Sequence, residues 1–347
     1  MRRDAAPPLP TIGDVALRAK VSTATVSRVV NQPGTVRDAP RLRVEAAIAQ
    51  LGYVPHAGAR TLKSRRSGTV GAIFPTVDNA IFAKAIDALQ RRLAEDSYQL
   101  LIATHDYNPS AEQRQALNLL ARGADALVLC GSGQPPALLE RLRLRGVPAV
   151  HVMNWPVPAE HISVGFDNAR AMGQVVKYLL DLGHRRIGML AGITRDNDRA
   201  ALRVQGVRAA MSAAGHALPP SRIVERRYGL EPARDGLREL MAAKSPPTAI
   251  VCGNDVLAVG ALLEAQHLGI AVPQQLSIVG FDDLELAAHI RPALTTVHVP
   301  SQEMWRLAAD RVLAALRGEA LPRTTQIQVA LVVRESSGPV AGSRRHR

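Results

Sequence analysis

Cysteine and aromatic residues are scarce in this chain, and long apolar runs are missing. It has only two cysteines, Cys130 and Cys252, far apart in the sequence, which excludes a disulfide scaffold and a zinc site built from thiolates. A reducing cytosol is therefore the expected compartment. No apolar run approaches the roughly 20 residues needed to cross a bilayer, and MRRDAAPPLP leads into no hydrophobic signal segment. We expect neither a membrane span nor secretion.

The motifs of common enzyme and nucleotide sites are also missing. The sequence contains no GxGxxG, GxxxxGKS, GxxxxGKT, GxSxG or HExxH pattern. The nearest segment, GSGQPP at 131–136, lacks a third glycine and is interpreted as a loop after a strand that lines part of a cleft. The ten histidines show no spacing that gathers a metal site. The sequence therefore predicts no catalytic residue, no cofactor and no metal ion, and it does not favour an enzyme.

The overall composition is that of an ordinary large globular protein, but the charge is unevenly distributed along the chain. The 347 residues, 47% hydrophobic and 21% charged, predict two or three packed domains. The net charge of +13 is concentrated at the ends, since residues 1–67 hold 12 Lys and Arg against 4 Asp and Glu. A basic head on a nearly neutral body is typical of a nucleic-acid module joined to a module with another task. A solvated basic arm without a partner is the alternative.

The head carries the pattern of three short helices. TIGDVALRAK places apolar residues at i, i+3, i+4 and i+7, with Thr11 as the N-cap. STATVSRVVN predicts a second helix with Ser22 as its N-cap, and a third helix is expected over 40–51, ended by Gly52. Two helices joined by a tight turn, followed by a third, describe a helix-turn-helix unit.

The second helix of such a unit enters the major groove of DNA. The side chains that its core does not use are Thr23, Ala24, Thr25, Ser27 and Arg28. Arg28 is suited to a bidentate contact with guanine, and the methyl groups of Thr23 and Ala24 suit a thymine methyl. The hydroxyls of Ser22, Thr25 and Ser27 are expected to hold phosphates. The alternative is a three-helix bundle with an incidental arginine.

The head sequence resembles the DNA-binding head of the LacI/GalR family of bacterial transcription regulators. VSxxTVSRVVN combined with LGYVP carries the resemblance. It implies a disordered arm at 1–10, a DNA-binding domain at 11–55 and a hinge at 56–67. Further DNA contacts are then expected from Asn31, Tyr53 and His56.

The segment PHAGARTLKS matches the family's hinge. In the family this segment becomes a short helix only on operator DNA, and its leucine wedges into the minor groove. The resemblance places Leu62 at the wedge and Ala59 between two hinge helices. An apolar wedge opens a base step and bends DNA, so the expectation is physically sound. A plain linker with a chance leucine is the alternative.

The body alternates short strands rich in Val, Ile and Leu with helical stretches from Thr69 onward. One series runs from GTVGAIFP to PAVHVMN, and a second runs from ISVGFD to LSIVGFD. Serial βα units predict parallel sheets covered by helices, and two such sheets leave a cleft at the carboxyl ends of their strands. We therefore predict two Rossmann-like lobes around a small-molecule site.

The body also resembles the effector domain of the LacI/GalR family. The expected fold is an all-α helix-turn-helix head plus hinge, followed by an α/β body of two Rossmann-like lobes that is periplasmic-binding-protein-like. The resemblance implies three crossings between lobes, with the helix at 301–317 returning to the first. The expected boundaries are 68–166 and 296–327 for lobe 1, 167–295 and 328–343 for lobe 2, and 344–347 for a basic tail.

The resemblance also implies an effector site at the strand ends that face the cleft. Arg203 in RAALRVQG matches the family's cleft arginine, and Asp282 in GFDD matches its late aspartate. Asp282 and Asp255 are also candidates for helix N-caps. Trp155 either stacks on a sugar ring or packs under a loop. The complete expected effector set is Phe74, Asn79, Phe82, Trp155, Asp167, Arg203, Asn254 and Asp282.

The function that follows is that of a sequence-specific DNA-binding transcription regulator, a repressor. It is expected to act as a homodimer on a pseudo-palindromic double-stranded operator, with Leu257, Ala261 and Leu262 of a helix at 256–267 as one candidate dimer surface. A small carbohydrate-like metabolite between the lobes, namely a sugar, a sugar acid such as gluconate, or a nucleoside-like molecule, switches operator affinity allosterically. Induction and co-repression both fit. We expect a cytoplasmic protein that is nucleoid-associated when bound to its operator.

Two other protein classes remain open at this stage. A solute-binding protein explains the body but not the basic head or the missing signal segment. A cytosolic sugar-converting enzyme with an appended basic arm lacks any recognisable acid, base or nucleophile arrangement.

Overall fold

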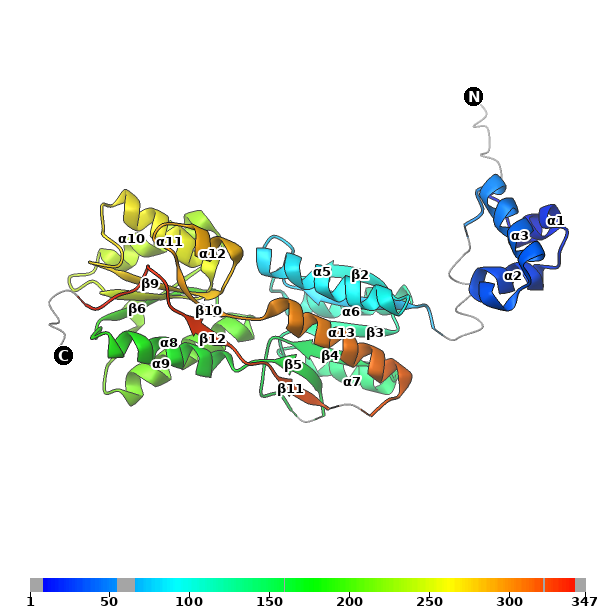
Figure 1. The fold of residues 1–347 in the computed structure, drawn as a ribbon. Coiled ribbons are helices and arrows are strands. Elements are labelled where there is room, and N and C mark those ends of the chain that lie inside the picture. Colours follow the sequence, from blue (N-terminus) through cyan, green and yellow to red (C-terminus); the bar gives the residue numbers. More distant parts are fainter. Residues whose placement is uncertain (1–8, 55–65, 159, 321, 341–347) are drawn as a thin grey trace, which may run out of the picture. The chain divides into compact units, whose positions relative to one another are not determined.

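The computed structural model describes residues 9–54, 66–158, 160–320 and 322–340. They fall into two compact units, Met1–Ser67 and Gly68–Arg347. We call these units the head and the body (Figure 1). None of the described helices is long and apolar enough to span a bilayer.

The head is a bundle of short helices whose ends are capped as the sequence predicts. In chain order its helices are α1 (Ile12–Ala19), α2 (Thr23–Asn31), the 3-10 turn η1 (Pro33–Thr35) and α3 (Asp38–Leu51). Thr11 and Asp14 form a capping box at α1, and the Ser22 hydroxyl accepts the Thr25 N–H at 3.2 Å at α2. α3 begins two residues before the predicted start. Pro40 permits this because the first turn of a helix needs no N–H donor there.

Apolar side chains from all three α-helices meet in one small core. Its buried members are Val15, Ala16, Ala19, Val26, Val29, Val44, Ala47 and Tyr53. Val26 and Val29 direct one face of α2 inward, so the opposite face of α2 remains exposed. Tyr53, expected to contact DNA, is only 8% exposed and packs within this core. Its predicted DNA contact stays a prediction.

The body contains two six-stranded sheets. The first has the order β11-β5-β4-β3-β1-β2 and the second β12-β10-β9-β8-β6-β7. All neighbouring strands are parallel except β10 and β12, which are antiparallel. The strands of the first sheet are β1 (Thr69–Phe74), β2 (Gln99–Thr104), β3 (Ala126–Cys130), β4 (Ala149–Val152), β5 (Ile162–Gly165) and β11 (Thr324–Gln326). Those of the second are β6 (Ile187–Gly192), β7 (Ile223–Arg226), β8 (Ala249–Cys252), β9 (Ser277–Asp282), β10 (Thr295–His298) and β12 (Ala330–Val332).

Helices cover both faces of each sheet, which confirms the predicted α/β architecture of two Rossmann-like lobes (Figure 1). The helices of the first lobe are α5 (Ala80–Glu95), α6 (Pro109–Ala121), α7 (Pro136–Leu144) and α13 (Ser301–Arg317). Those of the second lobe are α8 (Asn168–Asp181), α9 (Asp198–Ala213), α10 (Leu230–Met241), α11 (Asp255–His267) and α12 (Glu285–His289). α5 and α13 pack on one face of the first sheet, and α6 and α7 on the other.

The chain passes between the lobes three times, after β5, after β10 and after β11 (Figure 1). The second passage lies slightly beyond the boundary expected at about residue 295, because β10 pairs with β9 and β12 in the second sheet. The sequence did not predict β10 because its two threonines are common in loops as well as in strands. The strand in ISVGFD, which opens the second βα series in the sequence, pairs with β4 in the first sheet as β5, within the range expected for lobe 1.

The surface predicted for dimerisation on α11 is largely internal. Leu257 and Ala261 are fully buried and Leu262 is 7% exposed, because these side chains fill the core between α10, α11 and the second sheet. Leu263 of the same helix is 45% exposed. The three side chains named for this surface are therefore not available to contact a second copy.

Two glycines lie where α8 and α9 pack together, and they differ sharply in the space available. A Cβ on Gly206 of α9 would lie 2.1 Å from the Ala169 carbonyl oxygen, whereas a Cβ on Gly173 of α8 would lie 3.9 Å from the Ala210 Cβ. Only the glycine in α9 is therefore required by close approach of two backbones.

We predict that Gly206→Ala lowers the free energy of unfolding of the body by about 1–3 kcal/mol, because the added methyl group pushes the two helices apart. Gly173→Ala is the matched control, and its added methyl is expected to leave stability unchanged or raise it by up to about 1 kcal/mol. Urea unfolding followed by circular dichroism measures both. Equal stability of the two variants would contradict the packing argument.

Candidate functional site

The exposed face of α2 carries the side chains predicted to read DNA. Thr23, Ala24 and Arg28 are exposed, opposite the buried valines of the helix. The hydroxyls of Ser22 and Thr25 lie 3.0 Å apart and hydrogen-bond to each other. A phosphate contact from either hydroxyl would therefore have to compete with this local hydrogen bond. The side chain of Asn31 and all of His56, Ala59 and Leu62 lie outside the described residues.

In the body, strained backbone marks the carboxyl ends of the strands. Eight described non-glycine residues have positive φ, and six of them lie where a strand ends: Asp106, Tyr107, Met153, Asp196, Asp282 and Asp283. A left-handed backbone costs energy for residues with a Cβ, so its accumulation at one edge indicates a functional region. These ends come from both sheets and border one region, which we call the interlobe cleft.

A small cavity of about 30 Å³ lies deep in the interlobe cleft, and five of the eight predicted effector residues line it. These five are Asn79, Phe82, Arg203, Asn254 and Asp282. A second cavity of about 610 Å³ opens from the same cleft and shares Asn79, Tyr107, Asn197 and Tyr228 with the first. The predicted effector set thus includes about half of the polar residues that line the deep cavity.

Arg203 is the central charged group of the deep cavity. Its side chain projects from α9 and is only 5% exposed. Its Nε donates to Asn168 Oδ1 at 2.9 Å, one terminal nitrogen donates to the Gly253 carbonyl at 2.6 Å, and its guanidinium carbon lies 3.7 Å from the centre of the Phe281 ring. The remaining nitrogen lies 3.8 Å from Asp282 Oδ1. The guanidinium is therefore fixed and faces the cavity.

Asp282 faces Arg203 from the end of β9. Burial raises the pKa of its carboxyl to about 7, and the charge of Arg203 opposes this shift. Its Oδ1 has no hydrogen-bond partner among the described residues. A buried oxygen without a donor is costly, so it is prepared to accept a hydroxyl or amine of a ligand.

The two aspartates considered as helix caps have other roles. Asn254 caps α11, its Oδ1 accepting the Leu257 N–H at 3.0 Å, while Asp255 accepts the Thr296 hydroxyl at 2.5 Å and the Leu284 N–H at 2.7 Å. α12 has no side-chain cap, so Asp282 is not a cap either. Asp255 instead ties β10 to the segment after β9.

Three predicted effector residues lie away from the deep cavity. Phe74 is fully buried and packs against Phe82 and Trp305 in the core of the first lobe. Asp167 caps α8 by accepting the Arg170 N–H at 2.9 Å. Trp155 is half-buried and, like Asp167 and Phe74, lines neither the deep cavity nor the second cavity.

Several cavity residues escaped the sequence analysis. Tyr107 after β2 and Tyr228 after β7 line the deep cavity from opposite lobes, with ring centres 6.1 Å apart. Asn168, directly after the predicted Asp167, is the residue that bonds Arg203. The position of each tyrosine just after a strand, in a chain with only five tyrosines, was the available signal.

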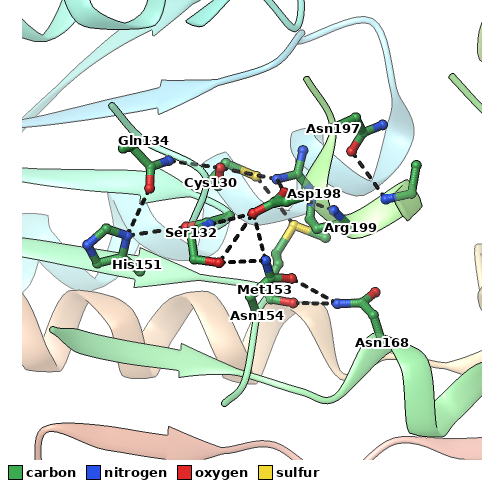
Figure 2. A network of polar contacts seen from close by, with 12 residues as sticks. Cys130, Ser132, Gln134, His151, Met153, Asn154, Asn168, Asn197, Asp198 and Arg199 are labelled. Carbon is green, nitrogen blue, oxygen red and sulfur yellow. Dashed lines mark hydrogen bonds and ion pairs between the residues drawn. The ribbon is translucent and has the colours of Figure 1, made fainter. Parts of the chain in front are cut away.

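A polar network joins the two lobes beside these cavities (Figure 2). Asp198, at the start of α9, accepts the Ser132 N–H at 2.6 Å and the Asn154 Nδ2 amide at 2.7 Å from the first lobe. Arg199 donates to the Cys130 carbonyl at 3.1 Å. The loop at 131–136, predicted to line the cleft, therefore contacts the second lobe directly.

Gly131 is what permits this approach. Its φ is +88°, and a Cβ there would lie 2.3 Å from an Arg199 nitrogen and 2.7 Å from the Asp198 carboxylate. Only glycine adopts this backbone without strain and leaves room for both side chains.

A helix-turn-helix head followed by two lobes with polar cavities between them defines a DNA-binding regulator that responds to a small molecule. Residues 11–56 match the family described as bacterial regulatory proteins of the lacI family, and residues 176–337 match the periplasmic binding protein-like domain. The two matches correspond to the head and to most of the body.

Relatives with curated functions agree with these matches. The chain is 35% identical over 329 residues to the ribose operon repressor of Haemophilus influenzae, covering 94% of this chain and 98% of that protein. It is 34% identical over 342 residues to the HTH-type transcriptional repressor PurR of Escherichia coli, covering 96% of this chain and 99% of PurR. The lac repressor dimer bound to operator and the anti-inducer ONPF has a similar structure, with a TM-score of 0.82, 26% identity and coverage of 95% and 100%.

The chain therefore belongs to the LacI family of bacterial regulatory proteins. It is a DNA-binding transcriptional repressor and not an enzyme, which confirms the resemblance seen in the sequence. Repressors of this family bind DNA operators and small-molecule effectors.

We predict that Arg28→Ala weakens operator binding by about 1–3 kcal/mol, because a bidentate contact to a base is lost. Fluorescence anisotropy with an operator fragment selected from genomic DNA, against a scrambled fragment, measures the effect. Arg91→Ala is the control, since Arg91 lies in the body and its side chain is 77% exposed. An equal loss on both fragments would assign Arg28 to phosphate.

We predict that Asp198→Asn lowers the free energy of unfolding by about 1–3 kcal/mol, because it places an amide donor against the donors of Ser132 and Asn154. Asp181→Asn is the control, because Asp181 pairs with Lys177 on the surface, where both side chains are more than half exposed. Its effect is expected to stay within about 0.5 kcal/mol. Urea unfolding compares the two, and identical midpoints would contradict the importance of this network.

Proposed function

We propose that this repressor is controlled by a carbohydrate-like metabolite bound in the interlobe cleft, and that it acts as a homodimer on a pseudo-palindromic operator. The observation that supports the effector site best is Arg203, a buried guanidinium that faces a cavity beside the unpartnered oxygen of Asp282. Fixed donors and acceptors of this kind recognise hydroxyl and carboxylate groups.

The side chains that line the deep cavity favour a polyhydroxylated ligand. Arg203 and Asn254 supply donors, Asp282 supplies an acceptor, and the rings of Phe82, Tyr107 and Tyr228 supply an apolar surface. The relative that acts as a ribose operon repressor supports a sugar as the effector class. A sugar acid such as gluconate would pair its carboxylate with Arg203, and a nucleoside-like ligand would stack on the tyrosines.

The deep cavity is too small to hold a sugar in the arrangement that the structure shows. About 30 Å³ holds no sugar, since ligand pockets usually measure roughly 300–1,000 Å³. Binding at Arg203 therefore requires the lobes or the side chains between them to move apart. A ligand that favours one lobe arrangement by about 1–3 kcal/mol changes operator affinity roughly 5–150-fold. Induction and co-repression are both compatible with this coupling.

Two copies are proposed because one head contacts too few bases for genomic specificity. The body exposes apolar side chains that a second copy could bury, namely Ile102 on the edge strand β2 and Leu263 on α11. Analytical ultracentrifugation tests this part directly, and a monomer at micromolar concentration with operator present would contradict it.

The effector itself can be found by screening sugars, sugar acids and nucleosides for thermal stabilisation of the full chain. A solute-binding protein or an enzyme would also be stabilised, but its DNA affinity would lack the steep salt dependence that several phosphate contacts cause. Binding to a selected operator that does not change with any stabilising ligand would overturn effector control.

We predict that Arg203→Ala abolishes the change in operator affinity caused by the effector, because the guanidinium no longer meets the ligand, while operator binding without effector persists. The control is Arg208→Ala, which removes an exposed arginine from the same helix, α9. Operator titrations with and without effector measure the response. A normal response of the Arg203 variant would remove this residue from the site.

A further inference from the structure

A third cavity of about 260 Å³ lies in the interlobe cleft and shares Asn197 and Arg199 with the deep cavity. Its lining residues include His105, Glu112 and Gln134 from the first lobe and Asp196, Asp198 and Arg199 from the second. No predicted effector residue lines it. Its volume is close to the lower end of the usual range for small-molecule pockets, about 300 Å³, which suits a single ring.

Glu112 is a buried acidic side chain that accepts fewer hydrogen bonds from the described residues than a carboxylate can. It lies in the first turn of α6, is only 5% exposed, and receives one hydrogen bond, from Gln134 Nε2 at 2.9 Å. Burial raises the pKa of its carboxyl above the usual value, and the hydrogen bond from Gln134 and the charge of Arg199 only partly offset this. A carboxylate can accept about four hydrogen bonds, so Glu112 retains capacity toward the cavity.

His105 supplies the second, independent observation. It follows β2, is 8% exposed, and neither ring nitrogen has a hydrogen-bond partner among the described residues. Burial and the nearby charge of Arg199 lower its pKa to about 4, so the ring is neutral at physiological pH. A neutral imidazole offers one donor and one acceptor, and both are unused here.

The charges around the cavity favour a cation. Glu112, Asp196 and Asp198 contribute three carboxylates, and Arg199 contributes one guanidinium. Asp198 is satisfied by Ser132 and Asn154, which leaves Glu112 as the buried carboxylate in need of a partner. The described residues contain no group of three or more His, Cys, Asp or Glu arranged to hold a metal ion. An organic ammonium group, with three donors, fits this environment better than a metal ion.

We propose that this cavity is a ligand subsite for the ammonium group of a small hydroxylated amine of the amino-sugar class. Glu112 is the counter-ion of the ammonium group, and His105 hydrogen-bonds a neighbouring hydroxyl. The inference rests on the proposed function, because it assigns a chemical class to the effector of the same cleft. It adds residues from α6 and from the loops after β2 and β3 to a site otherwise defined by Arg203.

The test compares amines with their neutral counterparts on the full-length chain. Glucosamine, galactosamine and mannosamine are titrated by calorimetry beside glucose, galactose and mannose, pair by pair. At least one amine is expected to bind about tenfold or more tightly than its neutral partner, as a charged hydrogen bond to a buried carboxylate provides. If every neutral sugar binds as tightly as its amine, the subsite is overturned.

Glu112→Gln is the decisive variant, because it keeps the shape and the acceptor for Gln134 but removes the charge. It is expected to bring the affinity of the preferred amine to that of its neutral counterpart. Glu140→Gln is the matched control, since Glu140 pairs with Arg143 on the exposed surface of α7, and it is expected to leave the preference intact. A preference that survives in Glu112→Gln overturns the proposal.

A second variant tests the site should Glu112→Gln fold poorly. His105→Phe keeps an aromatic ring but removes both nitrogens, and it is expected to weaken amine binding about fivefold or more by loss of a hydrogen bond. Unchanged amine binding overturns the role of His105. If neutral sugars alone bind and alter operator affinity, the ammonium subsite is wrong while the proposed function stands. If no metabolite alters operator affinity, the proposed function itself fails.

Discussion

Two guanidinium groups one helical turn apart on α9 are buried between the lobes, and a buried cation must be surrounded by acceptors. Arg203 meets this need within the second lobe, through Asn168, the Gly253 carbonyl and Asp282. Arg199 meets it across the cleft, at the Cys130 carbonyl of the first lobe. Arg199 lines both the deep cavity and the third cavity, so its position helps to divide the cleft.

The two lobes of the body share much of their interior. One continuous apolar cluster extends from the α5 and α13 side of the first lobe to the α8 and α9 side of the second. Phe166 at the end of β5 stacks on Phe281 of β9 with ring centres 5.8 Å apart. Any change of lobe angle must therefore slide packed apolar surfaces as well as exchange polar contacts. Packed surfaces of this kind favour discrete arrangements, which is what an allosteric switch requires.

Local chemistry made much of this molecule predictable. The caps at Thr11 and Ser22 and the alternation of strands and helices depend on neighbours in the sequence, and they are confirmed. Parallel strands bring their carboxyl ends to one edge, so residues just after strands, such as Asn79 and Asn254, were expected at the cleft and lie there.

The features that escaped the sequence depend on contacts between distant segments. Asn168 bonds Arg203, and Gln134 bonds Glu112, across 35 and 22 residues of chain. Phe74 was misplaced because a strand buried on both faces shows no alternation to indicate which way a ring points. β10 was missed because its threonines resemble a loop until β9 and β12 pair with it.

The threefold passage of the chain between lobes has a consequence for how such proteins diversify. Neither sheet is encoded by one continuous stretch of gene, since β11 completes the first sheet and β12 the second near the end of the chain. A single crossover between two related genes anywhere from β1 to β12 therefore mixes strands of different origin in at least one sheet, and between β6 and β11 it does so in both. A crossover at the junction of Ser67 and Gly68 breaks neither. Recombination at this junction can therefore join an existing body to a different DNA-binding head, but the body must be inherited whole.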